Sequence, residues 1–421
     1  MRIAIVYPFM LTNDGDYALL KVILRTISEV IPNAEVTLPL WNYKDLSGLK
    51  KWRVIVFKAS QPMMPRGILD MLLKLIWAIL YRFFKITSLD KEVRAIAESD
   101  IAIAPTRDML VLGSLGRITQ FFHTLFLVYL PKLMGKPTML YAVDIRPGGG
   151  LAKALLHPWL RLILNKLDMI TVRDKDSFYN LVRLGVDMSK VRLVADPVFL
   201  LESATNEEAL KILEEEGIPI EKRPIMGLSL NPLVYRPRRI SKSSQQEIML
   251  ILTNLVDFMI EELGATVIFI PRVKIFKDDD IVYAKTIKRL IKHKNKFFVL
   301  SRQYEPEQIR AIIGFLDFFI ALAFHALIHV VCMRVPLVAV DYGRKVLETM
   351  HGLGLGEFVI PARELTLEDF KDKVKLAWSM RDYIRNTLSN KITKYKVLAR
   401  LNTEAFKVFV NNYCQTKVRP N

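Results

Sequence analysis

The chain has 421 residues, of which 51% are hydrophobic and 25% are charged, and this balance excludes a disordered chain. A single hydrophobic core rarely organises so many residues, so we expect two domains. The formal net charge of +18 favours an anionic partner, but no zinc-finger or RNP-like motif accompanies the dispersed lysines and arginines, so we expect no nucleic acid.

The first half of the chain alternates short apolar runs with longer segments of helical pattern, which predicts strands joined by helices. After the first strand, Asn13 to Asp16 form an Asx/Gly turn into a helix, with Asp16 as the expected N-cap. The turn holds one glycine, so it is not a dinucleotide-binding fingerprint. Strands are predicted at 2–7, 35–40, 53–57, 100–104, 137–143, 168–172 and 191–195, and helices at 16–30, 67–84, 91–98, 116–133, 151–166 and 175–184.

The predicted helix at 67–84 is apolar except for Asp70, Lys74 and Arg82. Three charges in so short a segment make it a poor membrane span. Two interpretations stay open. The helix either packs in the protein core, or it lies in the interface of a membrane with an anionic surface.

A polar cluster follows the predicted strand at 168–172. Arg173 emerges at the carboxyl edge of its sheet, where a guanidinium could clamp a carboxylate or a phosphate. Asp174 is expected to cap the next helix and Gly185 to end it. The alternative for Arg173 is a salt bridge with a neighbouring acid. The next strand leads to Asp196, for which the alternative is a structural cap at a proline turn.

A charged stretch at 201–224 separates the halves, and we place the two domains at 1–203 and 204–421. The alternation of strands and helices then restarts, which predicts parallel sheets in both domains. Strands are predicted at 225–230, 266–271 and 296–300, and helices at 244–263, 281–293, 306–314, 366–388 and 390–412.

Residues 316–342 predict a strand at 318–323, a short helix and a second strand at 337–340, which together form a parallel unit. His325 follows the first strand and begins the helix, so it is expected at the carboxyl edge of the sheet. A helix N-terminus attracts anions, and an imidazole there could hold a phosphate or move a proton. The alternative is a buried histidine at the start of a helix.

Several short motifs occur in a fixed order along the chain. They are Asn13 to Asp16, Arg173-Asp174 with Ser177, Gly185-Val186, Ala195-Asp196-Pro197, and His325-Ala326 followed by Pro336 and Tyr342 to Lys345. In this order and spacing, the motifs resemble the polysaccharide pyruvyl transferase family. The resemblance covers the chain from about residue 3 to 355.

The resemblance implies an α/β fold with two Rossmann-like domains facing across a GT-B-like cleft, followed by C-terminal helices. It also implies transfer of the enolpyruvyl unit of phosphoenolpyruvate to a sugar of a cell-surface glycan or its lipid-linked precursor. Phosphoenolpyruvate would be a co-substrate, and no further cofactor and no metal are expected. By this resemblance His325 and Arg173 are catalytic, Asn13 and Asp16 shape the acceptor side, and Lys345 is a weaker candidate for binding an anion.

The chain departs from the family pattern two residues before the histidine, where the family usually has arginine and this chain has Ala323. Arg272 or Arg344 could supply the missing cation from another element. The acidic run at 278–280 could bind a cation, although a solvated loop is the expectation. Two alternative functions stay open: a GT-B-type glycosyltransferase that uses a nucleotide sugar, and a non-catalytic relative that binds glycan.

The number of cysteines and the first residues of the chain indicate where in the cell the protein is expected. Cys332 and Cys414 are too few for a disulfide framework, which favours a reducing environment. The chain opens on a predicted strand, so no signal peptide is expected. We expect a cytoplasmic protein that is peripheral at the inner face of the membrane if the helix at 67–84 contacts lipid.

Overall fold

The structure is a computed structural model, and its contacts divide the chain into two compact units. Unit 1 comprises Met1–Leu11, Leu19–Leu200 and Lys396–Asn421, and unit 2 comprises Thr12–Ala18 and Leu201–Tyr395. The structure describes residues 1–42, 46–59, 66–87, 90–105, 110–111, 118–146, 150–230, 242–273, 280–342 and 345–418.

The central element of unit 1 is a parallel sheet of eight strands, in the order β10-β9-β7-β5-β1-β3-β2 with β4 paired to β3. Its inner strands are fully buried apolar runs, which is typical of sheets covered by helices on both faces. The strands are β1 (Arg2–Ile5), β2 (Phe9–Met10), β3 (Glu35–Asn42), β4 (Arg53–Lys58), β5 (Ile101–Ala104), β7 (Thr138–Val143), β9 (Met169–Val172) and β10 (Val191–Leu193), and a separate pair is formed by β6 (Leu110–Val111) and β8 (Ile145–Arg146).

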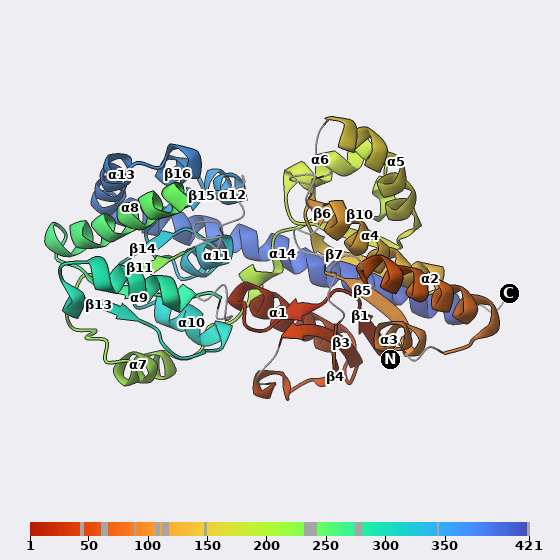
Figure 1. The fold of residues 1–421 in the computed structure, drawn as a ribbon. Helices are drawn as coiled ribbons and strands as arrows, with labels where there is room; N and C mark the ends of the chain where they lie inside the picture. Colours follow the sequence, from red (N-terminus) through yellow and green to blue (C-terminus); the bar gives the residue numbers. More distant parts are fainter. Residues whose placement is uncertain are drawn as a thin grey trace. The chain divides into compact units, whose positions relative to one another are not determined.

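Helices connect the strands of unit 1 as the parallel pairing requires (Figure 1). Within this layer α2 contacts α3 and α4, and α4 contacts α5. The helices are α1 (Asp14–Val30), whose first turn groups with unit 2, α2 (Arg66–Phe84), α3 (Lys91–Glu98), α4 (Ile118–Leu133), α5 (Gly150–Lys166) and α6 (Lys175–Leu184).

Unit 2 is built on a six-stranded parallel sheet in the order β13-β12-β11-β14-β15-β16. Its strands are β11 (Ile225–Ser229), β12 (Thr266–Phe269), β13 (Phe297–Val299), β14 (Phe318–Ala321), β15 (Leu337–Asp341) and β16 (Val359–Pro361). Its helices are α7 (Asn206–Glu215), α8 (Lys242–Glu261), α9 (Asp280–Leu290), α10 (Pro306–Ile313), α11 (Phe324–Cys332), α12 (Lys345–Leu353) and α13 (Leu367–Ser379).

The last helix, α14 (Arg381–Val418), runs through residues of both units, and this corrects the predicted domain boundary at the C-terminus. Residues from Lys396 onward group with unit 1, whereas the predicted second domain spans all of 204–421. The reason lies in Asn402, which is fully buried. Its side chain accepts a hydrogen bond from Thr171 Oγ1 at 3.2 Å and donates to the Ala195 carbonyl at 3.0 Å.

One further expectation about the elements needs correction. The predicted gap at residue 389 does not exist, because α13 ends at Ser379 and α14 continues from Arg381 without a break. The charged stretch at 201–224 contains helix α7, capped by the Thr205 side chain. Among the described residues, no helix is both long enough and apolar enough to cross a membrane.

Candidate functional site

The strand order of unit 2 defines where a ligand is expected. Strands β12 and β13 lie on one side of β11, and β14, β15 and β16 lie on the other, so the winding reverses between β11 and β14. In open α/β sheets ligands bind at the carboxyl ends of the strands at such a reversal. Ser229 ends β11 at this point, and its fully buried Oγ has no hydrogen-bond partner among the described residues.

His325 lies at the same edge, in the first turn of α11. The chain leaves β14 at Ala321 and enters α11 at Phe324, with the buried Ala323 as N-cap in an extended conformation. Among the residues that the structure describes, no side-chain hydrogen bond caps this helix, so the N–H groups of its first turn can bind an anion. The predicted position of His325 at a helix start on the carboxyl edge is therefore found in the structure.

The turn from Asn13 to Asp16 packs directly against His325. An ideal Cβ built on Gly15 would lie 2.3 Å from His325 Nδ1, so only glycine leaves room for the imidazole in this arrangement. Asn13 forms an isolated bridge with Val273, and the Asp14 N–H donates to the Arg272 carbonyl at 3.0 Å. The backbone of this turn thus lies between the β12 edge and the α11 edge of the sheet.

The expected N-cap of α1, Asp16, was wrong by three residues. Helix α1 begins at Asp14, and the Asn13 side chain accepts from the N–H groups of Gly15 at 3.1 Å and Asp16 at 3.3 Å. Asn13 is therefore the capping residue, whereas Asp16 is buried inside the first turn. The amide oxygen of Asn13 is used within the turn, and its predicted contact with an acceptor stays a prediction.

Arg272 follows β12 and reaches toward the end of the neighbouring strand β11. Its Nε donates to the Leu230 carbonyl at 3.3 Å, and the residue is 9% exposed. Among the described residues, the Arg272 side chain makes no other hydrogen bond. Its two terminal nitrogens, Nη1 and Nη2, can therefore bind a ligand as a pair at the strand edge. The backbone of Arg272 is held by the Asp280 carboxylate, which accepts from the N–H groups of Arg272 at 2.7 Å and Val273 at 3.1 Å.

This contact corrects the expected solvated acidic loop. Asp280 is fully buried and begins α9, where it fixes the strand end that carries Arg272. Asp278 and Asp279 lie outside the described residues, as does Arg344. Lys345, the remaining predicted anion-site residue, begins α12, and its Nζ lies 5.8 Å from the ring centroid of Phe324. Lys345 is therefore adjacent to the first residue of α11.

A buried pair behind His325 escaped the sequence analysis. His329 and Arg310 are both buried, and Arg310 Nε donates to His329 Nδ1 at 3.0 Å, so the ring proton resides on Nε2. Burial, followed by the positive charges of Arg310, His325 and Arg272, holds the pKa of His329 well below its usual value. The sequence did contain a signal for this pair. His325 and His329 are four residues apart, so both rings lie on one face of the helix.

The carboxyl edge of unit 2 thus gathers groups that bind anions. An imidazole, a guanidinium fork, an ammonium group and an uncapped helix N-terminus suit a ligand with two acidic groups, such as a phosphate and a carboxylate. The six predicted site residues divide between the units. His325, Arg272, Lys345, Asn13 and Asp16 belong to unit 2, and Arg173 belongs to unit 1.

Arg173 is engaged by two buried carboxylates at the ends of neighbouring strands. Its Nε and Nη2 donate to the Asp144 carboxylate at 2.9 and 3.0 Å, and its Nη1 donates to Asp196 at 2.5 Å. Asp144 follows β7 and Asp196 follows β10, so the guanidinium joins three strand ends. The structure shows the ion-pair alternative for Arg173, and its predicted contact with a donor stays a prediction.

The capping predictions around Arg173 are confirmed. Asp174 caps α6 and accepts from the Ser177 N–H at 2.7 Å, and Gly185 ends the helix in the left-handed conformation with φ of 69°. Asp196 accepts from the Val198 N–H at 3.0 Å, as expected for a cap at the proline turn.

Asp174 makes the stability of unit 1 depend on pH. Burial, and next the negative charge of Asp144, raises the pKa of Asp174 from 3.8 to about 6. The folded state therefore binds more protons than the unfolded state between these values, and stability falls as pH rises from about 4 to about 6, by about 3 kcal/mol at most. We expect an Asp174→Asn variant to lose this slope in urea unfolding midpoints measured at pH 4.5 and 7.

Asp187→Asn is the matched control, because Asp187 is also a cap that accepts from a backbone N–H, but its side chain is 56% exposed and its pKa is lowered by the bonds from Ser189. Its removal should leave the fall in stability between pH 4 and 6 unchanged. An identical slope in the wild type and in Asp174→Asn would contradict the assignment to Asp174.

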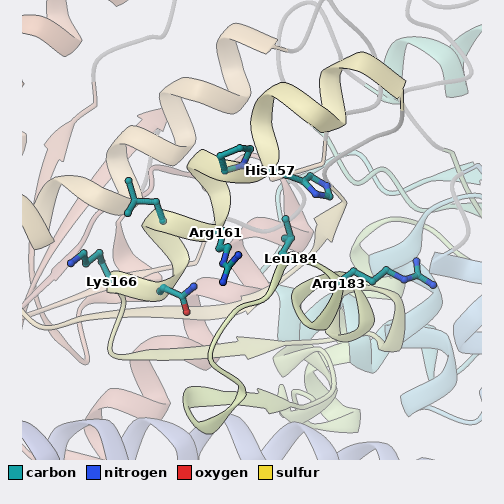
Figure 2. A pocket seen from close by; sticks show the side chains of 8 residues that line it. His157, Arg161, Lys166, Arg183 and Leu184 are labelled. Atoms are coloured by element: carbon teal, nitrogen blue, oxygen red, sulfur yellow. The ribbon is translucent and has the colours of Figure 1, made fainter.

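Two surface hollows lie away from the carboxyl edges. One, of about 700 Å³, is lined by the C-terminal halves of α5 and α6, including His157, Arg161, Lys166 and Arg183 (Figure 2). The other, of about 580 Å³, is lined by residues that precede or begin β11, β12 and β13. Since α5 and α6 also end where β9 and β10 begin, each hollow lies at the amino edge of the sheet of its own unit.

Two parallel α/β units define the class of protein. Solved structures with the same fold are glycosyltransferases and sugar-nucleotide enzymes of the GT-B type, which confirms the predicted fold class. A glycosyltransferase from Rickettsia africae ESF-5 shares 14% identity over 98% of this chain and 99% of its own, with a TM-score of 0.59. HepE from Anabaena in complex with UDP and glucose shares 10% over 100% of both chains, with a TM-score of 0.56.

A third solved structure, UDP-GlcNAc 2-epimerase from Neisseria meningitidis bound to UDP-GlcNAc, shares 10% identity over 96% of this chain and 99% of its own, with a TM-score of 0.57. No curated protein matches the chain significantly in sequence. The sequence profile described as polysaccharide pyruvyl transferase matches residues 13–344. The chain belongs to the polysaccharide pyruvyl transferase family, and the predicted family is confirmed.

Proposed function

We propose that the protein transfers the pyruvyl group of phosphoenolpyruvate to a sugar of a cell-surface glycan or its lipid-linked precursor. The observation that carries this proposal is the grouping of His325, Arg272 and the N-terminus of α11 at the carboxyl edge of unit 2. Phosphoenolpyruvate presents a phosphate and a carboxylate, and both suit these donors. Family membership supports the donor, and no other cofactor enters the proposal.

The proposed reaction balances without a redox partner. C3 of the donor accepts a proton while one sugar hydroxyl loses its proton and its oxygen bonds to C2. A second hydroxyl then bonds to C2 as the bond from C2 to the phosphate oxygen breaks, and its proton leaves with the inorganic phosphate. In this scheme His325 holds the departing phosphate or gives it a proton, at the helix N-terminus that stabilises the developing charge.

Arg272 takes the place of the arginine that the family usually has at position 323. Ala323 is buried and carries no charge, so it cannot clamp an anion. Arg272 approaches the same strand reversal from β12, with its terminal nitrogens forming a fork suited to a carboxylate or phosphate. Lys345, beside Phe324, supplies a further positive charge on the other side of α11.

The acceptor is proposed to approach along the Asn13–Asp16 turn. The Gly15 backbone touches the His325 ring, so a hydroxyl held by this turn would be close to the donor carbon. Catalysis of this kind depends on positioning, and effective molarities of well-oriented groups are large.

Isothermal titration calorimetry with phosphoenolpyruvate at low salt tests the donor site. We expect saturable binding that is weakened about 100-fold by Arg272→Met, because a charge-assisted contact is lost, and abolished by His325→Ala. Arg302→Met is the matched control, since Arg302 is an exposed arginine of unit 2 paired with Glu215, and it should bind as the wild type does.

A panel of nucleotide sugars in the same experiment separates the alternatives. Binding of a nucleotide sugar without phosphoenolpyruvate binding would overturn the proposal in favour of a glycosyltransferase, an alternative supported by the neighbours solved with UDP ligands. Binding of neither donor, with binding gained by Ala323→Arg, would indicate a glycan-binding relative that has lost catalysis.

A further inference from the structure

Helix α2 presents an apolar stripe on its outer face. Phe83 is 75% exposed, Leu69 61% and Ile76 53%. The spacing of three or four residues places these side chains on one side of the helix. The exposed stripe consists of Leu69, Leu72, Leu73, Ile76, Ile79 and Phe83.

The inner face of α2 carries the buried Lys74, whereas most exposed side chains of the helix are apolar, which is the reverse of the usual polarity of a surface helix. Lys74 is 1% exposed and forms ion pairs with Asp70 at 2.5 Å, Glu92 at 3.0 Å and Asp90 at 3.7 Å. Asp70 is the only acidic residue of α2, and this buried network engages it. The outer face of the helix therefore exposes apolar side chains and no carboxylate.

Positive charges gather where α2 ends. Arg82 and Lys85 are exposed, and the Nζ atom of Lys85 lies 5.0 Å from the ring centroid of Tyr81. Beside them Phe84 is 69% exposed. Aromatic side chains between cations are typical of segments at the boundary between lipid headgroups and acyl chains.

We propose that unit 1 docks on an anionic lipid bilayer through α2, with the apolar stripe in the boundary between headgroups and acyl chains. The cations at the end of the helix pair with lipid phosphates, and the net charge of +18 draws the protein to such a surface. A second copy of the chain fits this face less well. Arg82 lies in the last turn of α2 and Lys85 follows it, so two such helices paired in parallel would bring these cations together.

Docking of this kind keeps the protein at the inner face of the membrane, where a lipid-linked sugar is accessible. The inference stands independently of the proposed donor chemistry, because vesicle binding needs no phosphoenolpyruvate. The two proposals can therefore fail separately.

Sedimentation with phosphatidylcholine vesicles, with and without phosphatidylglycerol, tests the docking. We expect binding to anionic vesicles that weakens about tenfold or more in Ile76→Ser/Phe83→Ser, since two apolar anchors are removed. Arg82→Glu/Lys85→Glu should weaken the binding similarly and remove most of its salt dependence. The matched control is Val282→Ser/Leu290→Ser on α9, where the two side chains are 56% and 59% exposed. This control should bind as the wild type does.

Equal sedimentation with and without phosphatidylglycerol would overturn the proposal, and so would equal binding by all variants. Light scattering in solution provides the remaining readout. A dimer that dissociates in Ile76→Ser/Phe83→Ser, without vesicle binding by the wild type, would assign the stripe to a second copy and overturn the lipid assignment. All four proteins should unfold at similar temperatures, because every substituted side chain is exposed.

Discussion

Replacing Arg173 by methionine is expected to lower the unfolding free energy of the protein by about 3–5 kcal/mol. Methionine keeps an unbranched apolar stem but removes the guanidinium and its charge. Asp144 and Asp196 would then remain 1% and 3% exposed without the cation that now satisfies them. Breaking a buried ion pair by removing one partner is among the most destabilising of single substitutions. Urea unfolding, followed for the transition of unit 1, measures the loss.

Arg192→Met on the adjacent strand β10 is the matched control. Arg192 is exposed, and its guanidinium donates to the carbonyls of Ser189 and Val191. Its replacement should change stability by less than about 0.5 kcal/mol. Arg173→Lys should fall between the two, because an ammonium keeps the charge but cannot reproduce a fork that reaches both carboxylates. Unchanged stability in Arg173→Met, together with lost phosphoenolpyruvate binding, would instead assign Arg173 to the donor.

Elements with local signals were predictable from the sequence. The apolar runs of buried parallel strands located β14 and β15 to within two residues, and the helix at 91–98 was predicted with the bounds that α3 has. Asp174 and Gly185 were assigned correctly as the caps of α6. Caps and buried runs depend on residues adjacent in the chain, so their physics is visible in a short window.

The partners of charged residues were not predictable, because they are set by the sheet order. Arg173 contacts carboxylates 29 and 23 residues away, and Arg310 contacts a histidine 19 residues away. Nothing in the local pattern distinguishes a guanidinium that binds a ligand from one that binds an acid of a neighbouring strand. The return of α14 to unit 1 has the same origin, since Asn402 bonds to Thr171, 231 residues before it.

The candidate site combines both kinds of information. His325 could be placed from its own strand and helix, whereas Arg272 gains significance only because β12 lies next to β11, on the other side of the strand reversal from β14. From the sequence alone, Ala323 indicates that the site has lost the positive charge of the arginine that the family usually has there. In the fold, a neighbouring strand supplies a guanidinium at the same sheet edge, and the proposed donor site depends on that adjacency.

Gly15→Ala is expected to reduce activity about 100-fold or more while changing the unfolding free energy by less than about 2 kcal/mol. The added Cβ would lie 2.3 Å from Nδ1 and 2.4 Å from Cγ of His325, which is far inside van der Waals contact, so the imidazole must move. A misplacement of about 1 Å in a reacting group costs about two orders of magnitude in rate. Stability changes less, because alanine favours the helix over glycine by about 1 kcal/mol and offsets part of the overpacking.

A double-mutant cycle with His325→Ala isolates the steric contact. In the wild-type background Gly15→Ala should destabilise or be neutral, whereas in the His325→Ala background the ring is gone and the helix propensity of alanine remains. The same substitution should then stabilise the protein by up to about 1 kcal/mol. If Gly15→Ala stabilises both backgrounds equally and leaves turnover intact, the imidazole does not lie against this turn. The acceptor path proposed along Asn13–Asp16 would then fail with it.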